Sequence, residues 1–483
     1  MTNRITGLTC RDQGRTMASI RLGKGSHVND STRRFGLARH LLMFSLVALM
    51  VGAPTPAGAA DFEVGTAAGV PGMSGVEDGA GVGGEAPFAK LGSARGATAM
   101  GGKIYFVEPT RIRRYDPVAN QVVTIVGSTT PGYVDGNFSD ARFVDLSEIT
   151  DFEGDLYVAE SHRVRKIDLG LLTVTTIAGS ATPGSTDGQG VNASFSDVRG
   201  PFALGGMLYV VDSTDVTLRR IDPDTAQVTT LAGAVGQPGG QDGFGTAARF
   251  VSPRNLAGEG KFLYIADTNG SAIRRYNTET TEVTTIAGNG VSETLDGIGT
   301  AARVKRPRGM QVWGGYLYFA DFTDHIIRRV NLQTLQVTTV AGTTADGGYV
   351  DGTGTNAEFS APWGVTATTG HLYIIDTGNF LLRKMTVPSE STSVSLKVNK
   401  TAQKAKASGK VLPAHPGRKV SVSLYRKVNG AFKKKAGKTV VLSNTSSYSA
   451  SFNRLGQGRC KFTTRWPGDE DSLARTKSVP FNC

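Results

Sequence analysis

The sequence predicts an all-β protein in which a β-propeller is followed by a small β-sandwich. Three observations lead to this prediction. A unit of 52 to 55 residues recurs six times, each unit contains several short runs rich in Val, Ile, Thr and Tyr, and the composition changes near Pro388. Repetition at this period, with several short strands in each unit, is typical of propellers rather than of helical solenoids.

Two pairs of residues mark each unit. The tyrosine of a Leu-Tyr-like pair is found at Tyr105, Tyr157, Tyr209, Tyr264, Tyr318 and Tyr373. The aspartate of an Asp-Gly pair is found at Asp78, Asp135, Asp187, Asp242, Asp296 and Asp351. We predict four strands, a to d, in each unit. Strand a follows a Pro-Arg-Gly-like start, b is the Leu-Tyr run, c is the Ile-Arg-Arg run and d is the Val-Thr-Thr run, since β-branched and aromatic residues favour strands.

The two ends of the repeat region complement each other. The sixth unit stops at Val387-Pro388 without a d strand, and Val64–Gly69 matches the d strand Val283–Gly288 position for position. An N-terminal strand that completed the last blade would remove two open sheet edges. We therefore predict a closed ring of six blades.

The motifs of the unit resemble a known family. The run Leu263–Asn269, then Ile273-Arg274-Arg275, then Val-Thr-Thr-Ile-Ala-Gly and Asp-Gly-x-Gly-x-x-Ala are similar to the NHL repeat, and the resemblance covers about residues 62–386. It implies a six-bladed propeller. Members of this family mostly bind proteins, RNA or other ligands, and a few are enzymes, so the resemblance implies the fold more strongly than the function.

The first 60 residues are predicted to be an export signal with its n-region, removed from the mature chain. Arg33, Arg34 and Arg39 precede the apolar run Leu41–Ala53, which is too short to span a bilayer, and Ala57-Gly58-Ala59 offers a small-residue cleavage site. A general secretory signal and twin-arginine export both stay open. Secretion, with retention at the cell envelope as a further option, is the expected localisation, and no later segment is apolar enough to span a membrane.

Charge divides the rest of the chain. Residues 61–387 carry 26 basic and 35 acidic residues, a net charge of −9, whereas residues 388–483 carry 19 and 4, a net charge of +15. The alternating runs after Pro388 predict a small antiparallel sandwich that resembles immunoglobulin-like modules. Its two cysteines, Cys460 and Cys483, are predicted to form a disulfide. Its basic run Lys433-Lys434-Lys435 is either a solvated hairpin or a patch for anionic surfaces.

Strand a begins, and strand b ends, on the same face of the predicted disc. We call the centre of this face the mouth, and we predict ligand-binding residues at the start of each strand a: Arg95, Ser147, Arg199, Arg254, Arg308 and Trp363. Guanidinium groups suit carboxylates or phosphates, and a tryptophan suits a sugar or aromatic face. The lone Ser and the lone Trp make this ring asymmetric, as a site would be.

The other candidate groups are better explained by structural roles than by a binding or catalytic site. The acids that end strand b are Glu108, Glu160, Asp212, Asp267, Asp321 and Asp376, and an acid in every blade suggests that it fixes a turn or pairs with an arginine. The Asp-Gly loops lack the alternating oxygen ligands of a calcium site. Histidines show no zinc spacing, and no catalytic triad stands out. We therefore predict no catalytic residues, no metal and no cofactor.

These observations favour a secreted binding protein over an enzyme. The expected partner is an extracellular protein, a glycan or an anionic envelope polymer. Nucleic acid is not expected, because the propeller is acidic and lacks basic patches with stacking aromatics. Two alternatives stay open: an extracellular hydrolase or lyase that uses the mouth, and a structural envelope or adhesin component.

Overall fold

The computed structural model describes most of the chain after the predicted signal. The described residues are 62–84, 88–344, 346–388, 393–394, 396–400, 404–412, 419–428, 431–441, 447–453, 459–466 and 475–482. The predicted export segment, residues 1–60, lies outside them. Within the described part no helix is long and apolar enough to cross a bilayer.

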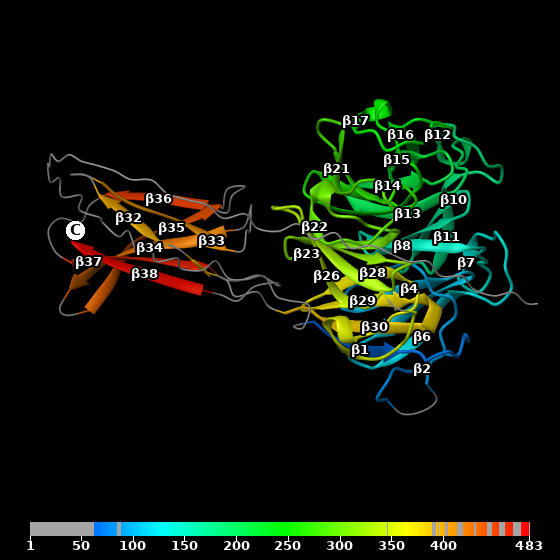
Figure 1. The fold of residues 1–483 in the computed structure, drawn as a ribbon, viewed down its shortest axis with the longest axis horizontal. Coiled ribbons are helices and arrows are strands. Elements are labelled where there is room, and N and C mark those ends of the chain that lie inside the picture. Colours follow the sequence, from blue (N-terminus) through cyan, green and yellow to red (C-terminus); the bar gives the residue numbers. More distant parts are fainter. Residues whose placement is uncertain are drawn as a thin grey trace, which may run out of the picture. The chain divides into compact units, whose positions relative to one another are not determined.

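Residues 62–388 form six five-stranded antiparallel sheets, the repeated arrangement of a β-propeller (Figure 1). The first sheet has the order β2 (Gly79–Ala80), β6 (Gln121–Gly127), β5 (Arg111–Asp116), β4 (Lys103–Glu108), β3 (Ala97–Met100). The second has the order β7 (Gly136–Asn137), β11 (Thr173–Gly179), β10 (Arg163–Asp168), β9 (Asp155–Glu160), β8 (Leu146–Phe152). The third has the order β12 (Gly188–Gln189), β16 (Gln227–Gly233), β15 (Thr217–Ile221), β14 (Met207–Asp212), β13 (Val198–Leu204).

The remaining three sheets repeat this order. The fourth consists of β17 (Gly243–Phe244), β21 (Glu282–Gly288), β20 (Ala272–Asn277), β19 (Phe262–Asp267), β18 (Pro253–Glu259). The fifth consists of β22 (Gly297–Ile298), β26 (Gln336–Gly342), β25 (Ile326–Asn331), β24 (Tyr316–Asp321), β23 (Pro307–Trp313). The sixth consists of β27 (Gly352–Thr353), β1 (Glu63–Ala68), β30 (Leu381–Thr386), β29 (His371–Asp376), β28 (Pro362–Thr368). Single 3₁₀ turns occur at η2 (Gly190–Asn192), η3 (Gly245–Ala247), η4 (Gly299–Ala301), η5 (Gly354–Asn356) and η6 (Thr377–Asn379).

Each sheet has one strand more than the four predicted. The extra strand is the two-residue run after the Asp-Gly aspartate, which pairs with strand d, as Gly297 does with Val337. The aspartate explains the difference: Asp296 accepts hydrogen bonds from the backbone N–H (2.9 Å) and the hydroxyl (3.1 Å) of Thr339 on strand d. The side chain therefore holds its own segment against the sheet edge.

The core lies between neighbouring sheets and follows from the alternation along strand b. On β24, Tyr316 and Tyr318 pack with the sixth sheet, whereas Leu317 and Phe319 pack with the fourth. Because successive side chains of a strand point to opposite faces, a strand buried on both faces must be apolar throughout. This accounts for the Leu-Tyr run in every repeat.

The N-terminal strand β1 belongs to the sixth sheet. It pairs with β30, with Val64 opposite Met385, and with β27, with Val64 opposite Gly352. Thr66 donates its N–H (3.0 Å) and its hydroxyl (2.9 Å) to Asp351, as the strand-d threonines do in the other five sheets. Strand β1 thus occupies the d position of the last sheet.

The strands of residues 393–482 form two further sheets. One contains β31 (Ser393–Val394), β33 (Lys404–Leu412), β32 (Lys397–Lys400) and β36 (Ser447–Asn453). The other has the order β35 (Ala431–Val441), β34 (Lys419–Val428), β37 (Arg459–Trp466), β38 (Arg475–Asn482). They share a core that includes Val422, Phe452 and Phe462. Cys460 is buried, but Cys483 lies outside the described residues, so the disulfide stays a prediction.

Candidate functional site

One arginine of strand c is buried in every sheet and connects three parts of it. These arginines are Arg113, Arg165, Arg219, Arg274, Arg328 and Arg383, each at most 1% exposed. In the fifth sheet, Arg328 donates to Asp296 (2.9 Å) and to the carbonyls of Leu295 and Arg303, and it lies 3.4 Å from Asp321. The Asp-Gly aspartates and the strand-c arginines therefore hold each sheet together.

The acids that end strand b belong to the same scaffold. Asp321 accepts the backbone N–H groups of Lys305 (3.1 Å) and Arg306 (2.9 Å), which immediately precede strand a of its own sheet. Asp376 accepts the N–H of Ser360 in the same way. Burial raises the pKa of Asp376 to about 6, and the hydrogen bonds from Asn379 and Arg383 oppose this rise. These acids hold the d–a loops in place. Their carboxylates are therefore not available to pair with the mouth arginines.

The start of strand a faces the end of strand b, as predicted. The register places Pro307 opposite Asp321 and Pro362 opposite Asp376. The a strands of successive sheets also contact one another, from β3 through β8, β13, β18 and β23 to β28, and β28 contacts β3. The predicted mouth residues are therefore gathered around the centre of one face.

Trp363 connects side chains from three sheets. Arg308 lies over its ring at 4.1 Å and Arg95 at 5.5 Å. Its indole N–H donates to Glu148 Oε1 at 3.3 Å, although Glu148 belongs to the second sheet and Trp363 to the sixth. This bond passes over the intervening first sheet, so these side chains meet in one constellation.

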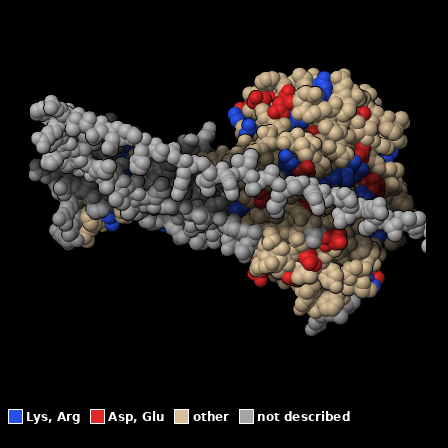
Figure 2. Space-filling view, in the orientation of Figure 1, with Lys and Arg blue, Asp and Glu red and all other residues tan. Residues whose placement is uncertain are grey.

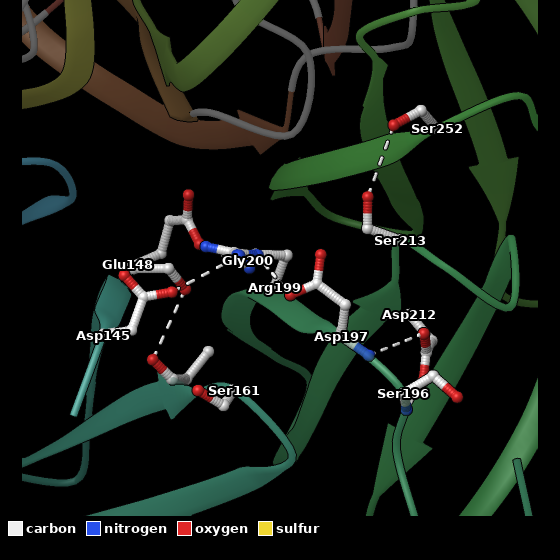
Figure 3. A network of polar contacts seen from close by, with 12 residues as sticks. Asp145, Glu148, Ser161, Ser196, Asp197, Arg199, Gly200, Asp212, Ser213 and Ser252 are labelled. Carbon is white, nitrogen blue, oxygen red and sulfur yellow. Dashed lines mark hydrogen bonds and ion pairs between the residues drawn. The ribbon is translucent and has the colours of Figure 1, made fainter. Parts of the chain in front are cut away.

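Two of the four mouth arginines are paired with acids. Arg95 donates to Asp145 at 2.5 Å, and Arg199 donates to Asp197 at 2.8 Å and lies 3.8 Å from Asp145. Figure 3 shows this network around Arg199, in which Asp212 accepts the N–H groups of Ser196 and Asp197. Burial lowers the pKa of Arg199, but Glu148, Asp197 and Asp145 outweigh it and raise that pKa overall.

The other two, Arg254 and Arg308, have no ion pair among the described residues. Arg308 is 6% exposed, and its Nε and Nη1 are buried without a hydrogen-bond partner in the described part of the chain. Its guanidinium lies 4.9 Å from the ring centre of Phe322 and 4.1 Å from that of Trp363, and the two rings meet edge to face. Burial, followed by the charge of Arg254, lowers the pKa of Arg308 to about 9. The group is therefore protonated at neutral pH, and no acid forms an ion pair with it among the described residues.

Glu148 is the mouth residue that the sequence argument missed. It follows Ser147, and at the same position the other repeats carry Gly96, Gly200, Asn255, Gly309 and Gly364. The glycines are needed because adjacent a strands approach closely: a Cβ on Gly309 would lie 2.3 Å from the carbonyl oxygen of Trp363. A glutamate at a glycine position of the repeat was the signal. Glu148 is 3% exposed and accepts the N–H of Gly200 at 3.2 Å.

Ser147 does not face a ligand. It is completely buried, and its hydroxyl lies 3.4 Å from the carbonyl oxygen of Ala159 on strand b of the same sheet. The second sheet contributes Glu148 to the mouth in its place.

A polar cavity of about 290 Å³ lies among the a strands below the mouth. Asn255 and Gly309, which follow Arg254 and Arg308, line it together with Glu148. Thr98 and Asp151 also line it and are joined by a hydrogen bond of 2.6 Å. Arg254 and Arg308 themselves do not line it.

Acidic and basic side chains of the propeller are interspersed on the face drawn in Figure 2. Within the described residues, no group of three or more His, Cys, Asp or Glu side chains is placed to hold a metal ion.

Comparison with known proteins supports the repeat assignment. No protein-family model matches the chain. NHL repeat-containing protein 2 of Bos taurus is 26% identical over 314 residues, which cover 57% of this chain and 43% of that protein. Protein SUPPRESSOR OF QUENCHING 1, chloroplastic, of Arabidopsis thaliana is 29% identical over 300 residues, which cover 54% of this chain and 27% of that protein. The chain therefore spans less than half of these relatives.

A solved structure supports the fold. A structural genomics protein of unknown function from Bacteroides thetaiotaomicron superimposes with a TM-score of 0.52 at 21% identity, over 68% of this chain and 76% of that one. At this identity the likeness concerns the fold alone. The repeated sheets make residues 62–388 a β-propeller, and its sequence is similar to that of NHL repeat-containing proteins.

Proposed function

We propose that this protein is a binding protein whose mouth holds an anionic group of a partner molecule. The observation that carries the proposal is Arg308, a buried guanidinium with two unpaired donor nitrogens. Buried charges in proteins are normally paired. The rings of Phe322 and Trp363, which meet each other edge to face, both pack against the guanidinium and hold it in place. An arginine held in this way presents a rigid fork that suits planar anions.

The wider setting is also proposed. The six sheets form a closed ring, supported by the pairing of β1 with β30 and by the bond from Thr377 Oγ1 to the carbonyl of Ala94 (2.7 Å). The protein is exported, and the last 96 residues form an immunoglobulin-like module. Its partner is an extracellular protein, with glycans and envelope polymers as further candidates, and it acts outside the cell or at the envelope. The strand-b acids are bonded to backbone and arginines, which favours binding over hydrolysis at the mouth.

Replacing Arg308 by methionine separates a site from a scaffold. Methionine keeps the packing between Phe322 and Trp363 but removes a buried charge that no acid neutralises. We expect loss of anion binding in a fluorescence or calorimetric titration, with a melting temperature unchanged or raised, because replacing an unsatisfied buried charge by an apolar group does not destabilise. A variant that unfolds at a lower temperature would show that Arg308 is structural.

The basic tail gives a separate test of envelope binding. Lys433, Lys434 and Lys435 are exposed on β35, and residues 388–483 carry +15. We expect residues 389–483 to bind dextran sulfate or isolated envelope material at low salt and to release it as salt approaches 1 M, where the screening length is about 3 Å. Binding that ignores salt, or that resides in residues 61–387 alone, would reject this role.

A further inference from the structure

We propose that the mouth selects a carboxylate of a protein partner over dianions such as sulfate and phosphate, and that Glu148 is the residue that makes this choice. The inference rests on the proposed function, since it concerns the same mouth. It goes further by naming the ligand group and the residue that sets the preference.

The first argument is charge. Arg95 and Arg199 are neutralised by Asp145 and Asp197, so two unpaired arginines and one acid are left at the centre of the mouth. Arg306, whose Nη2 donates to Asn269, adds to the positive field around Arg308. Arg254, Arg306 and Arg308 with Glu148 therefore carry a net charge of +2, which would be +3 without Glu148. Because Glu148 repels a dianion about twice as strongly as a monoanion, it lowers the attraction for a dianion more.

The second argument is the fixed position of Glu148. Its two oxygens are bound from opposite sides, by the N–H of Gly200 (3.2 Å) and by the indole N–H of Trp363 (3.3 Å). A carboxylate that is 3% exposed cannot turn into solvent to escape an incoming anion. Repulsion between like charges in a partly desolvated site is strong, because the effective dielectric constant is far below that of water. Glu148 therefore opposes each additional negative charge on a ligand.

The third argument is shape. The guanidinium of Arg308 packs against two rings, and because it is planar its free donors lie in one plane. A planar carboxylate can accept two of these donors side by side, which is the geometry that arginine recognises best. Trp363 packs against Arg308 and donates a hydrogen bond to Glu148. The group that attracts the anion and the group that discriminates between anions are therefore positioned by the same side chain.

Two sources supply such a carboxylate in a protein partner: an acidic side chain and a chain terminus. Both present the same group. The experiment distinguishes them with two small peptides, N-acetyl-Gly-Ala-Gly with a free C-terminus and N-acetyl-Gly-Asp-Gly with an amidated one.

The test is a titration of the full chain at constant ionic strength with sodium acetate, sodium sulfate and the two peptides, followed by tryptophan fluorescence. Trp363→Phe identifies the part of the signal that comes from the mouth. We expect acetate and at least one peptide to bind, and sulfate to bind more weakly. In Glu148→Gln, which keeps the side-chain volume but has one oxygen to accept the N–H groups of Gly200 and Trp363, we expect the ratio of sulfate to acetate affinity to rise about tenfold or more.

The outcomes are separable. If Arg254→Met and Arg308→Met leave acetate binding unchanged, the proposed function itself fails. If these variants abolish binding but Glu148→Gln leaves the ratio of affinities as it was, the mouth is an anion site without this selectivity and only the present inference fails. If sulfate binds the parent protein as tightly as acetate does, the present inference also fails, whereas the proposed function stands. Equal melting temperatures of the parent and Glu148→Gln exclude misfolding as a cause.

Discussion

Replacing Arg328 by methionine is expected to lower the free energy of unfolding of the propeller by about 3–5 kcal/mol, the usual cost of removing one partner from a buried ion pair. Arg328 is fully buried and serves Asp296, Asp321 and two backbone carbonyls. Its loss leaves Asp321 buried, and burial already raises the pKa of that acid. Thermal and denaturant unfolding measure the effect.

Three variants control this result. Arg308→Met, in the same sheet, removes a buried arginine that has no acid partner and should not destabilise. Lys261→Met breaks an exposed pair with Glu279 and should cost less than about 1 kcal/mol. Arg219→Met should lower the free energy of unfolding by an amount between those of Arg328→Met and Lys261→Met. The reason is that Arg219 pairs with Asp187 but forms no pair with Asp212 in the described structure. Equal destabilisation by Arg328→Met and Arg308→Met would contradict the division into scaffold and site.

The propeller could be read from the sequence because each strand is specified locally and repeated. The Leu-Tyr run of β24 is apolar on both faces, and the same pattern at a constant period defines the strands and their order. The two-residue edge strands were missed because their pairing depends on the side chain of Asp296 and its counterparts reaching strand d. A residue run of this length carries no strand pattern of its own.

The mouth could be predicted in position but not in chemistry. The repeat placed Arg199 and Arg308 at equivalent points, yet one is paired and the other is not. The difference comes from neighbours outside the repeated motif, since Asp197 pairs with Arg199 two residues away. Contact between Glu148 and Trp363 joins positions 215 residues apart, which no local pattern reveals. A departure from the repeat, glutamate for glycine, was the visible signal.

Deleting residues 61–69 is expected to lower the melting temperature by about 10 °C or more. The deletion removes β1, and with it Phe62 and Val64, which are 0% and 2% exposed in the core shared with the fifth sheet. Losing one buried phenylalanine side chain alone costs about 3–5 kcal/mol, and each kcal/mol shifts the melting temperature of a domain of 150–250 residues by about 2–4 °C. The truncation also opens the edges of β27 and β30, so the protein is expected to associate through them.

Two variants show whether the effect belongs to the strand. A shorter truncation, which removes only residues 1–60, leaves β1 in place. Its melting temperature should equal that of the parent. Thr66→Val keeps the strand and its shape but removes the hydroxyl bond to Asp351, for a cost of about 1 kcal/mol. Calorimetry gives the melting temperatures and sedimentation gives the association state. A protein without residues 61–69 that melts with the parent and stays monomeric would show that the sixth sheet does not need β1, and the ring would then have to be held together by the contact between β28 and β3.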